Sequence, residues 1–327
     1  MNGKKTLIIF FSLAGILAAA FFIFAAHASE SFFPGQKTCE VTYRALIRGI
    51  PEEARSVRVW IPLASSRDGQ TVLKREMDTP AAYQVTADPV YGNEMVYFDL
   101  KPPFPKPLEF QIRYEARISR KDFRKAGRKR EDIHKYLKPS MLMTVNEEVL
   151  RRTQAAVGQK EGLLQKARAI YEDVIRRMTY DKTLPGWGQG DTLRACLLGK
   201  GNCTDFHSLF ISMAHAAEIP ARFKIGLTIP DAPEGEIPGY HCWAEFYDEA
   251  RGWLPVDASE AWKHPERKEI YFGGFDAQKF LISMGRDVEL VPRQSGPPVN
   301  IFFYPYVEVD GKEWNDAGTS FRFRNLK

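Results

Sequence analysis

The sequence from residue 199 to residue 223 reads GKGNCTDFHSLFISMAHAAEIPARF. Apolar residues recur in it at three- and four-residue steps from Phe206 to Ala217, which predicts an amphipathic helix that stops before Pro220. A glycine-containing turn leads into this helix and places Cys203 in its first turn. The free N–H groups and the dipole of a helix N-terminus stabilise a thiolate, and the same N–H groups can bind an oxyanion. The stretch therefore predicts a helix that begins with a cysteine of lowered pKa.

Two residues farther along the chain complete a candidate site. His241 begins a predicted strand that runs to Tyr247, and Asp257 ends a short apolar strand over residues 252–256. The turn over residues 248–252 makes these strands antiparallel neighbours, so Asp257 comes within hydrogen-bonding reach of His241. An imidazole fixed on a strand can take the proton of a thiol, and a carboxylate at its far nitrogen fixes its tautomer. We predict Cys203 as nucleophile, His241 as its base and Asp257 as the group that orients the base.

The sequence around these residues resembles the transglutaminase-like superfamily. The resemblance is specific between residues 199 and 259 and looser over residues 160–198. Its motifs are Gly201-Asn202-Cys203 at a helix start, Ile219-Pro220-Ala221-Arg222, His241-Cys242-Trp243-Ala244-Glu245 and Gly252-Trp253-Leu254-Pro255-Val256-Asp257. The resemblance implies a papain-like α+β core in which Cys203, His241 and Asp257 match the catalytic triad of the family.

The resemblance also implies an activity. The expected enzyme is a thiol acyltransferase or hydrolase that acts on amide bonds of peptides or proteins. The superfamily includes peptidases, amidases, transamidases and inactive scaffolds, so the fold does not choose among them. A non-enzymatic protein-binding module of the cell envelope, built on the same fold, is the alternative. The chain is much shorter than animal crosslinking transglutaminases and has no loop that resembles an EF-hand, so calcium activation is not implied.

The family uses an upstream residue to help bind the oxyanion. Gln189 and Trp187, in the segment PGWGQG at residues 185–190, are the candidates for this role, and Tyr180 is a third. Each of them could equally be a loop or packing residue. The backbone N–H of Cys203 is the safer donor.

A zinc site is the competing interpretation of this part of the sequence. The side chains that it would use are Cys196, Cys203, His207, His241 and Cys242. His241 and Cys242 are neighbours on a strand, so their side chains point to opposite faces. We therefore expect no metal and no cofactor.

The N-terminal residues 1–28 are predicted to be a secretory signal peptide or an N-terminal anchor. Lys4 and Lys5 precede an apolar run, and Ala26-His27-Ala28 fits a cleavage site. The run is near the length that spans a bilayer, so an uncleaved anchor is the alternative. Both interpretations place the protein in the periplasm or cell envelope. The chain has only four cysteines, too few for a disulfide scaffold at this length, and the disulfide status of Cys39, Cys196 and Cys242 stays open.

The remaining 36–327 segment is predicted to hold two domains of an α+β protein. Alternating apolar and polar residues, clearest over residues 108–118, predict an N-terminal β-sandwich at residues 36–118. Residues 119–158 follow as a basic linker, and residues 159–327 form the transglutaminase-like catalytic domain. Within it we predict a helix at residues 163–178 and a short helix at residues 192–198 with Asp191 and Gly199 at its ends. C-terminal strands follow, with a hairpin signal at Asp310-Gly311.

The net charge of +5 is concentrated in the stretch from Arg117 to Lys138. A solvated linker is the preferred interpretation, and peripheral contact with an anionic membrane surface is the second. No aromatic interleaving accompanies the basic residues, so nucleic acid is not an expected partner. The expected partner is a peptide or protein substrate.

Overall fold

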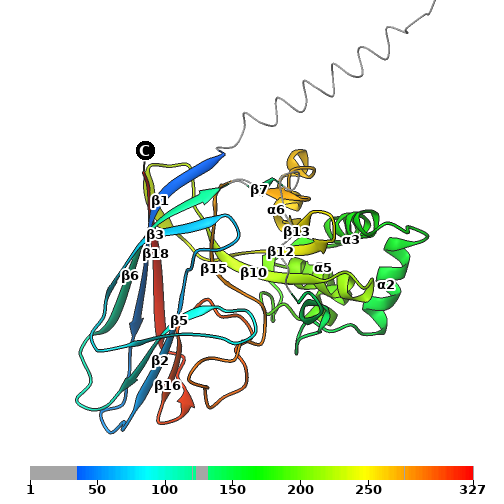
Figure 1. The fold of residues 1–327 in the computed structure, drawn as a ribbon. Coiled ribbons are helices and arrows are strands. Elements are labelled where there is room, and N and C mark those ends of the chain that lie inside the picture. Colours follow the sequence, from blue (N-terminus) through cyan, green and yellow to red (C-terminus); the bar gives the residue numbers. More distant parts are fainter. Residues whose placement is uncertain (1–34, 120, 123–131, 276, 327) are drawn as a thin grey trace, which may run out of the picture.

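The computed structural model describes residues 35–119, 121–122, 132–275 and 277–326. The predicted signal peptide or anchor at residues 1–28 lies outside these residues, as does part of the basic stretch. The described residues form a β-sandwich and a mixed core of helices and strands that lie side by side (Figure 1). The predicted fold class, a β-sandwich followed by an α+β core, is confirmed.

Two five-stranded antiparallel sheets face each other in the sandwich. Phe110 of one sheet and Phe98 of the other meet in its core with ring centroids 4.6 Å apart. Along residues 108–118 every second residue is buried, as the alternation predicted. The first sheet contains, in spatial order, β11 (Glu234–Ile237), β18 (Ala317–Leu326), β1 (Gln36–Ile47), β6 (Leu108–Ser119) and β3 (Gln70–Asp78). The second contains β17 (Lys312–Glu313), β16 (Tyr306–Val309), β2 (Val57–Leu63), β5 (Glu94–Leu100) and β4 (Gln84–Ala87).

The C-terminal strands belong to the sandwich and not to the helix-containing core, which differs from the predicted boundary of a 159–327 domain. β18 pairs with β1 along its whole length, from Thr38–Leu326 to Ile47–Ala317, and β16 pairs with β2. The predicted hairpin at Asp310-Gly311 is present between β16 and β17. Strand pairing over such a sequence distance leaves no local pattern, so the hairpin was predictable and its partner sheet was not.

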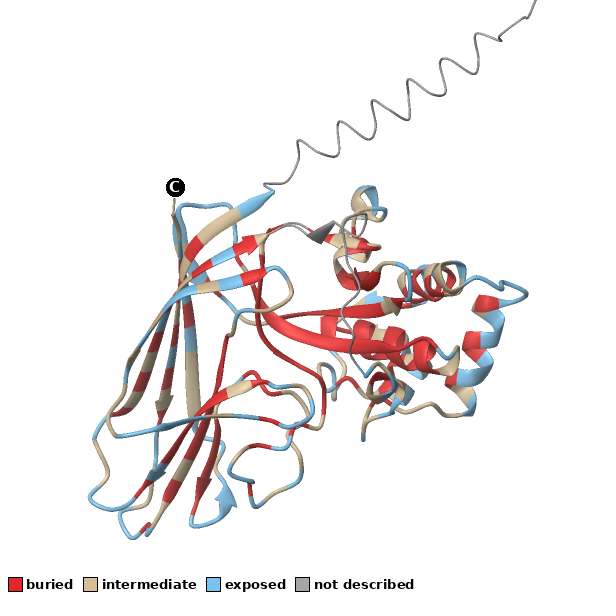
Figure 2. Ribbon diagram, in the orientation of Figure 1, coloured by how far each residue is buried: buried red, intermediate tan, exposed pale blue. Residues whose placement is uncertain are grey.

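The core domain consists of a four-stranded antiparallel sheet covered by helices. Figure 2 shows that buried residues run through α5 (Cys203–Ala216) and the two middle strands of the sheet. The sheet contains, in spatial order, β13 (Gly252–Val256), β12 (His241–Asp248), β10 (Ala221–Thr228) and β15 (Lys279–Met284). The helices are α2 (Glu147–Val157), α3 (Leu163–Arg177), α4 (Thr192–Leu198), α5 (Cys203–Ala216) and α6 (Ala258–Lys263). Two short pairs complete the core, β8 (Thr179–Tyr180) with β9 (Lys200–Gly201) and β7 (Lys121–Asp122) with β14 (Gly274–Phe275).

The ends of α4 follow the predicted capping residues. The Asp191 side chain accepts a hydrogen bond from the N–H of Arg194 at 3.0 Å. Gly199 ends the helix in the left-handed conformation with φ of 61°. A Cβ at this position would lie 2.7 Å from the carbonyl oxygen of Arg177, so both the backbone angle and the space require glycine. By contrast, α2 begins at Glu147, inside the segment predicted as a linker. None of the helices in the described part of the chain is long and apolar enough to cross a bilayer.

A buried ion cluster joins the sandwich to the core. Glu245 on β12 accepts from Arg222 at 2.8 Å and lies 2.8 Å from Lys224, both on β10. Asp68, in the sandwich loop between β2 and β3, lies 2.6 Å from Lys224 and 3.2 Å from Arg222. Arg222, Lys224 and Glu245 are almost completely buried. Buried charges are tolerated only when they are paired, so the cluster holds the two domains in one arrangement.

Replacing Glu245 tests this link. In Glu245→Gln, Arg222 and Lys224 keep only the partly exposed Asp68 as the acidic member of this cluster, and we expect the free energy of unfolding to fall by about 3 kcal/mol or more in urea denaturation. The matched control is Glu109→Gln, which removes a partly exposed ion pair with Arg44 and should change the free energy by less than about 1 kcal/mol. Equal effects of the two substitutions would contradict a role of the cluster in stability.

Candidate active site

Cys203 is the first residue of α5, as predicted. The Asn202 side chain caps the helix and accepts from the N–H of Thr204 at 2.9 Å. The Asp205 carboxylate accepts a hydrogen bond from the N–H of Asn202 at 2.9 Å, which completes a capping box. These bonds fix the direction of the first turn, so the Cys203 thiol is held at the positive end of the helix dipole.

The glycine-rich loop before α5 is tied to the helix by the same carboxylate. The N–H groups of Gly188 and Gly190 donate to Asp205 at 2.7 and 3.1 Å. Gly190 has φ of 68°, and a Cβ there would lie 2.4 Å from Oγ of Ser208. No other residue type fits this close approach. The loop that carries Trp187 and Gln189 is therefore held against the N-terminal turn of α5.

His241 and Asp257 are joined by a short hydrogen bond. His241 begins β12, and its Nε2 lies 2.6 Å from Oδ2 of Asp257. Asp257 is 1% exposed and also caps α6, where its Oδ1 accepts from the N–H of Glu260 at 3.0 Å. The strand pairing ends at Ala244 and Val256, so Asp257 reaches His241 from one position beyond the paired residues. The hydrogen bond to Asp257 uses Nε2 of His241, so Nδ1 is the ring nitrogen that remains for a second partner.

The charges of this group favour an ion pair between sulfur and imidazole. Hydrogen bonds from Cys242 and His241, together with the positive charge of His241, hold the pKa of the Cys203 thiol well below its usual range, although burial opposes them. Burial lowers the pKa of His241, but the charge of Asp257 and its hydrogen bond outweigh burial and raise this pKa to about 9. The lowered pKa of Cys203 and the raised pKa of His241 favour the thiolate–imidazolium form of the pair over the neutral form.

Cys242 lies beside Cys203, a contact that the sequence did not predict. Burial, and then its hydrogen bond to Cys203, raise the pKa of the Cys242 thiol well above its usual range. Cys242 is therefore the proton donor of the two thiols. Its sulfur also lies 3.4 Å from Oγ1 of Thr204. All four cysteines are free thiols in this structure.

His207 is a second residue that sequence reasoning missed. Its Nε2 accepts from the N–H of Ala258 at 3.0 Å, and its Nδ1 donates to the carbonyl oxygen of Cys203 at 2.7 Å. Burial lowers the pKa of His207, which agrees with a neutral ring that uses one nitrogen as acceptor and one as donor. His207 therefore connects the residue after Asp257 with the first residue of α5. The spacing of His207, one helical turn after Cys203, is the feature of the sequence that could have indicated this role.

Lys279 and Trp243 complete the surroundings of the imidazole. The Lys279 ammonium lies 3.0 Å from Oδ2 of Asp257 and is buried with it. The charges of His241 and Lys279 outweigh burial and hold the pKa of Asp257 well below its usual range. Trp243 stacks on His241 with an interplanar angle of 18°, as expected for two residues on one strand face. A lysine at the start of the apolar strand β15 gave little indication of this role.

The three oxyanion candidates lie in different environments. Trp187 is 40% exposed, and the Lys182 ammonium lies 5.3 Å from its ring centre. Gln189 is held by its carbonyl oxygen, which accepts from Arg286 at 2.7 Å, and its side chain is exposed. Tyr180 lies on β8, and its pKa is raised first by burial and then by the charge of Cys203. The hydroxyl of Tyr180 is therefore in electrostatic range of the sulfur.

The side chains of Cys203 and His241 are hardly accessible to solvent. Cys203 is 2% exposed and His241 7% exposed. Tyr240 and Tyr304 lie near the sulfur, since its charge contributes to raising the pKa of both hydroxyls. The ring centroids of these two tyrosines are 6.2 Å apart.

Among the residues that the structure describes, no three histidine, cysteine, aspartate or glutamate side chains converge in a way that could hold a metal ion. The near neighbours of Cys203 are groups that donate or share protons, namely Cys242, His241 and His207.

Comparison with known sequence families identifies the core. Residues 151–258 match the transglutaminase-like superfamily, and this range contains Cys203, His241 and Asp257. The resemblance predicted from the sequence motifs is confirmed. An uncharacterized protein of Haemophilus influenzae is 30% identical over 217 residues, which are 56% of this chain and 59% of that protein. The chain thus spans less than two thirds of the relative that it matches.

One solved structure shows that the fold is shared. A protein from Cytophaga hutchinsonii, described as a candidate cysteine protease, is 16% identical and matches with a TM-score of 0.59. The match covers 90% of this chain and 93% of that one, so it includes both domains. The periplasmic domain of TgpA from Pseudomonas aeruginosa is 15% identical, with a TM-score of 0.38 over 70% of this chain and 90% of that domain.

The charge distribution predicts how Cys203 reacts. At pH 6 the Cys203 thiolate should be alkylated by iodoacetamide, since its pKa is lowered, and His241→Ala should slow the reaction about a hundredfold. Peptide mass spectrometry measures this rate. The partly exposed Cys196 is the internal reference, because its rate should not respond to the substitution. A rate for Cys203 that stays within about twofold would contradict the ion pair.

Proposed function

We propose that the transglutaminase-like core is a cysteine-dependent enzyme that transfers or hydrolyses acyl groups of amide bonds in peptides or proteins. The observation that carries this proposal is the lowered pKa of Cys203 beside an imidazole that is hydrogen-bonded to Asp257 at 2.6 Å. A thiolate at neutral pH, a protonated base and a buried carboxylate are the parts that acyl transfer to sulfur requires. The N-terminal segment predicted for export would place the substrates outside the cytoplasm.

The reaction has two balanced halves. The Cys203 thiolate attacks the amide carbonyl carbon, the C–N bond breaks, and the His241 imidazolium gives its proton to the leaving amine. A thioester on Cys203 and a neutral imidazole remain. Water or a second amine then attacks the thioester, His241 accepts the proton of the attacking group, and the thiolate leaves. Asp257 stays ionised throughout and stabilises the imidazolium.

The oxyanion of each tetrahedral intermediate would be bound by the N-terminal N–H groups of α5 and by one upstream side chain. Tyr180, Trp187 and Gln189 are the candidates. Tyr180 has the support of the electrostatics, because the charge of Cys203 reaches its hydroxyl. A phenol that donates to the oxyanion would act where charge develops in the transition state.

One observation favours the alternative of a non-enzymatic binding module. Cys203 is 2% exposed, and so a substrate reaches it only if neighbouring side chains move. A module that uses the sandwich or the covered site to dock a partner would not need this movement. The two functions differ in whether an acyl group ever forms a bond with Cys203.

Trapping the acyl-enzyme separates these functions. We expect p-nitrophenyl acetate to acylate Cys203 in a rapid burst. In a separate incubation, a cell-envelope extract should place a larger acyl group on Cys203, which mass spectrometry identifies. Cys203→Ala is the control and should take up neither group. Cys196 is more exposed than Cys203, and it should nevertheless remain unmodified over the same time. A chain without any acyl group on Cys203 would leave the binding module as the function.

The oxyanion donor is identified by three substitutions. Tyr180→Phe removes only the hydroxyl, and we expect the rate of acylation to fall about a hundredfold with little change in folding. Trp187→Phe and Gln189→Ala should each lower the rate of acylation less than about threefold. A single strong side-chain donor, here Tyr180, is enough to account for a hundredfold effect. A hundredfold effect of either control, with Tyr180→Phe unaffected, would assign the role to that residue instead.

A further inference from the structure

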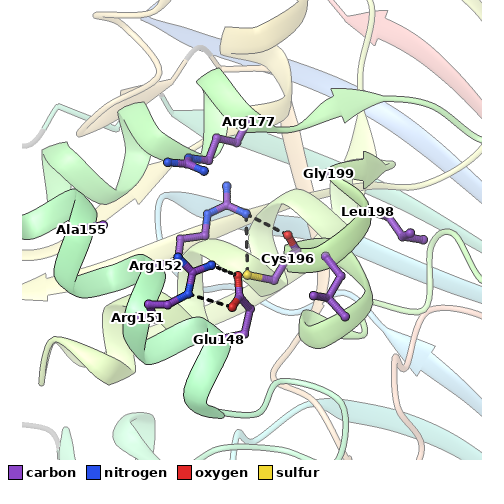
Figure 3. A pocket seen from close by; sticks show the side chains of 9 residues that line it. Glu148, Arg151, Arg152, Ala155, Arg177, Cys196, Leu198 and Gly199 are labelled. Carbon is purple, nitrogen blue, oxygen red and sulfur yellow. Dashed lines mark hydrogen bonds and ion pairs between the residues drawn. The ribbon is translucent and has the colours of Figure 1, made fainter.

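A second site of distinct chemistry lies where α2, α3 and α4 meet. It is a pocket of about 310 Å³ lined by Glu148, Arg151, Arg152, Arg177, Cys196 and Gly199, with two leucines at its edge. Figure 3 shows the arginines of α2 and α3 and Cys196 of α4 around one space. We call it the arginine pocket. Leu197 and Leu198 at its edge are 64% and 49% exposed.

The arginine pocket has more positive than negative charge. Asp173 of α3 lies 2.8 Å from Arg152, 2.6 Å from Arg176 and 3.0 Å from Arg177, so three guanidinium groups share one carboxylate. Arg151 is paired separately with Glu148, with Nε 3.0 Å from the carboxylate. Four arginines thus share two carboxylates, and this cluster has an excess of positive charge, to which Arg176 contributes from outside the pocket.

Arg152 is the group that points to a ligand. Its side chain is 5% exposed, and its Nη2 is buried with no hydrogen-bond partner among the described residues. Its Nη1 makes only long contacts, 3.4 Å to the carbonyl oxygen and 3.8 Å to the sulfur of Cys196. A buried guanidinium donor without an acceptor is unfavourable, so an oxygen at this position would be strongly bound. In Figure 3 this arm of Arg152 points toward Arg177.

We propose that the arginine pocket binds a phosphate group. The excess positive charge attracts an anion, and the oxygens of a phosphate can accept from several guanidinium groups at once. Arg151 and Arg177 have long side chains that are 72% and 54% exposed, so they can turn over an anion that enters beside Arg152. The volume exceeds that of one phosphate and leaves room for an attached group. The phosphate would come from a free phosphomonoester or from a lipid headgroup, whose chains the two leucines could contact.

This proposal is independent of the chemistry assigned to Cys203. Gly199 lines the arginine pocket, and its carbonyl oxygen accepts from the N–H of Thr179 at 2.7 Å. Residues 200–202 alone connect it to the nucleophile helix. The pocket is therefore outside the candidate active site but on the same chain segment.

The test is calorimetric titration of the full chain with inorganic phosphate at constant ionic strength. We expect saturable binding, weakened at least about tenfold by Arg177→Gln and by Arg151→Gln. Arg176→Gln is the matched control: Arg176 pairs with the same Asp173 and is 69% exposed, but it does not line the pocket. Phosphate should also slow iodoacetamide labelling of Cys196 in a Cys203→Ala background.

Vesicles distinguish the source of the phosphate. Binding to phosphatidic acid vesicles, lost in Arg177→Gln and absent for phosphatidylcholine, would identify a lipid headgroup, while inorganic phosphate alone would identify a soluble ester. Either result supports the proposal that the arginine pocket binds a phosphate group. The proposal is overturned if neither ligand binds, if chloride is equally effective, or if Arg176→Gln weakens binding as much as Arg177→Gln.

Discussion

The hydrogen bond between His241 and Asp257 is the interaction on which the site depends. It joins two groups that are almost completely buried, and burial alone would make both of them neutral. Because each stabilises the charge of the other, His241 remains protonated and Asp257 ionised. Lys279 adds a second cation on Asp257 at 3.0 Å, so the carboxylate keeps its charge even when the imidazole loses its proton. The reactivity proposed for Cys203 follows from this arrangement.

The fold brings three separate pieces of chain to this hydrogen bond. The helix α5 carries Cys203, β12 carries His241, and the junction of β13 and α6 carries Asp257. His207 connects the first and third pieces, because it binds the carbonyl of Cys203 and the N–H of Ala258. Asp205 holds the glycine loop against α5. Most of these bonds are buried, and a buried hydrogen-bond network holds the groups that it joins in one arrangement.

Features with a local cause were predictable from the sequence. Asp191 and Gly199 define the ends of α4, and the turn before Cys203 begins α5, because caps and glycine conformations are decided by neighbouring residues. The pairing of β18 with β1 was not predictable, since it joins opposite ends of the chain. The contact of Cys242 with Cys203 and the place of Lys279 beside Asp257 were missed for the same reason. His207 had a local signal, its spacing of one helical turn from Cys203, but its partner Ala258 is distant in sequence.

Titration of the His241 imidazole by NMR tests the central claim most directly. The resonance is assigned by its loss in His241→Ala, and the account predicts a midpoint at about pH 9 in the wild-type chain. Asp257→Asn should lower that midpoint, because the carboxylate charge is the main force that raises it against burial. A wild-type midpoint near the ordinary histidine value of about 6.5 would contradict the ion pair, and with it the proposed activation of Cys203.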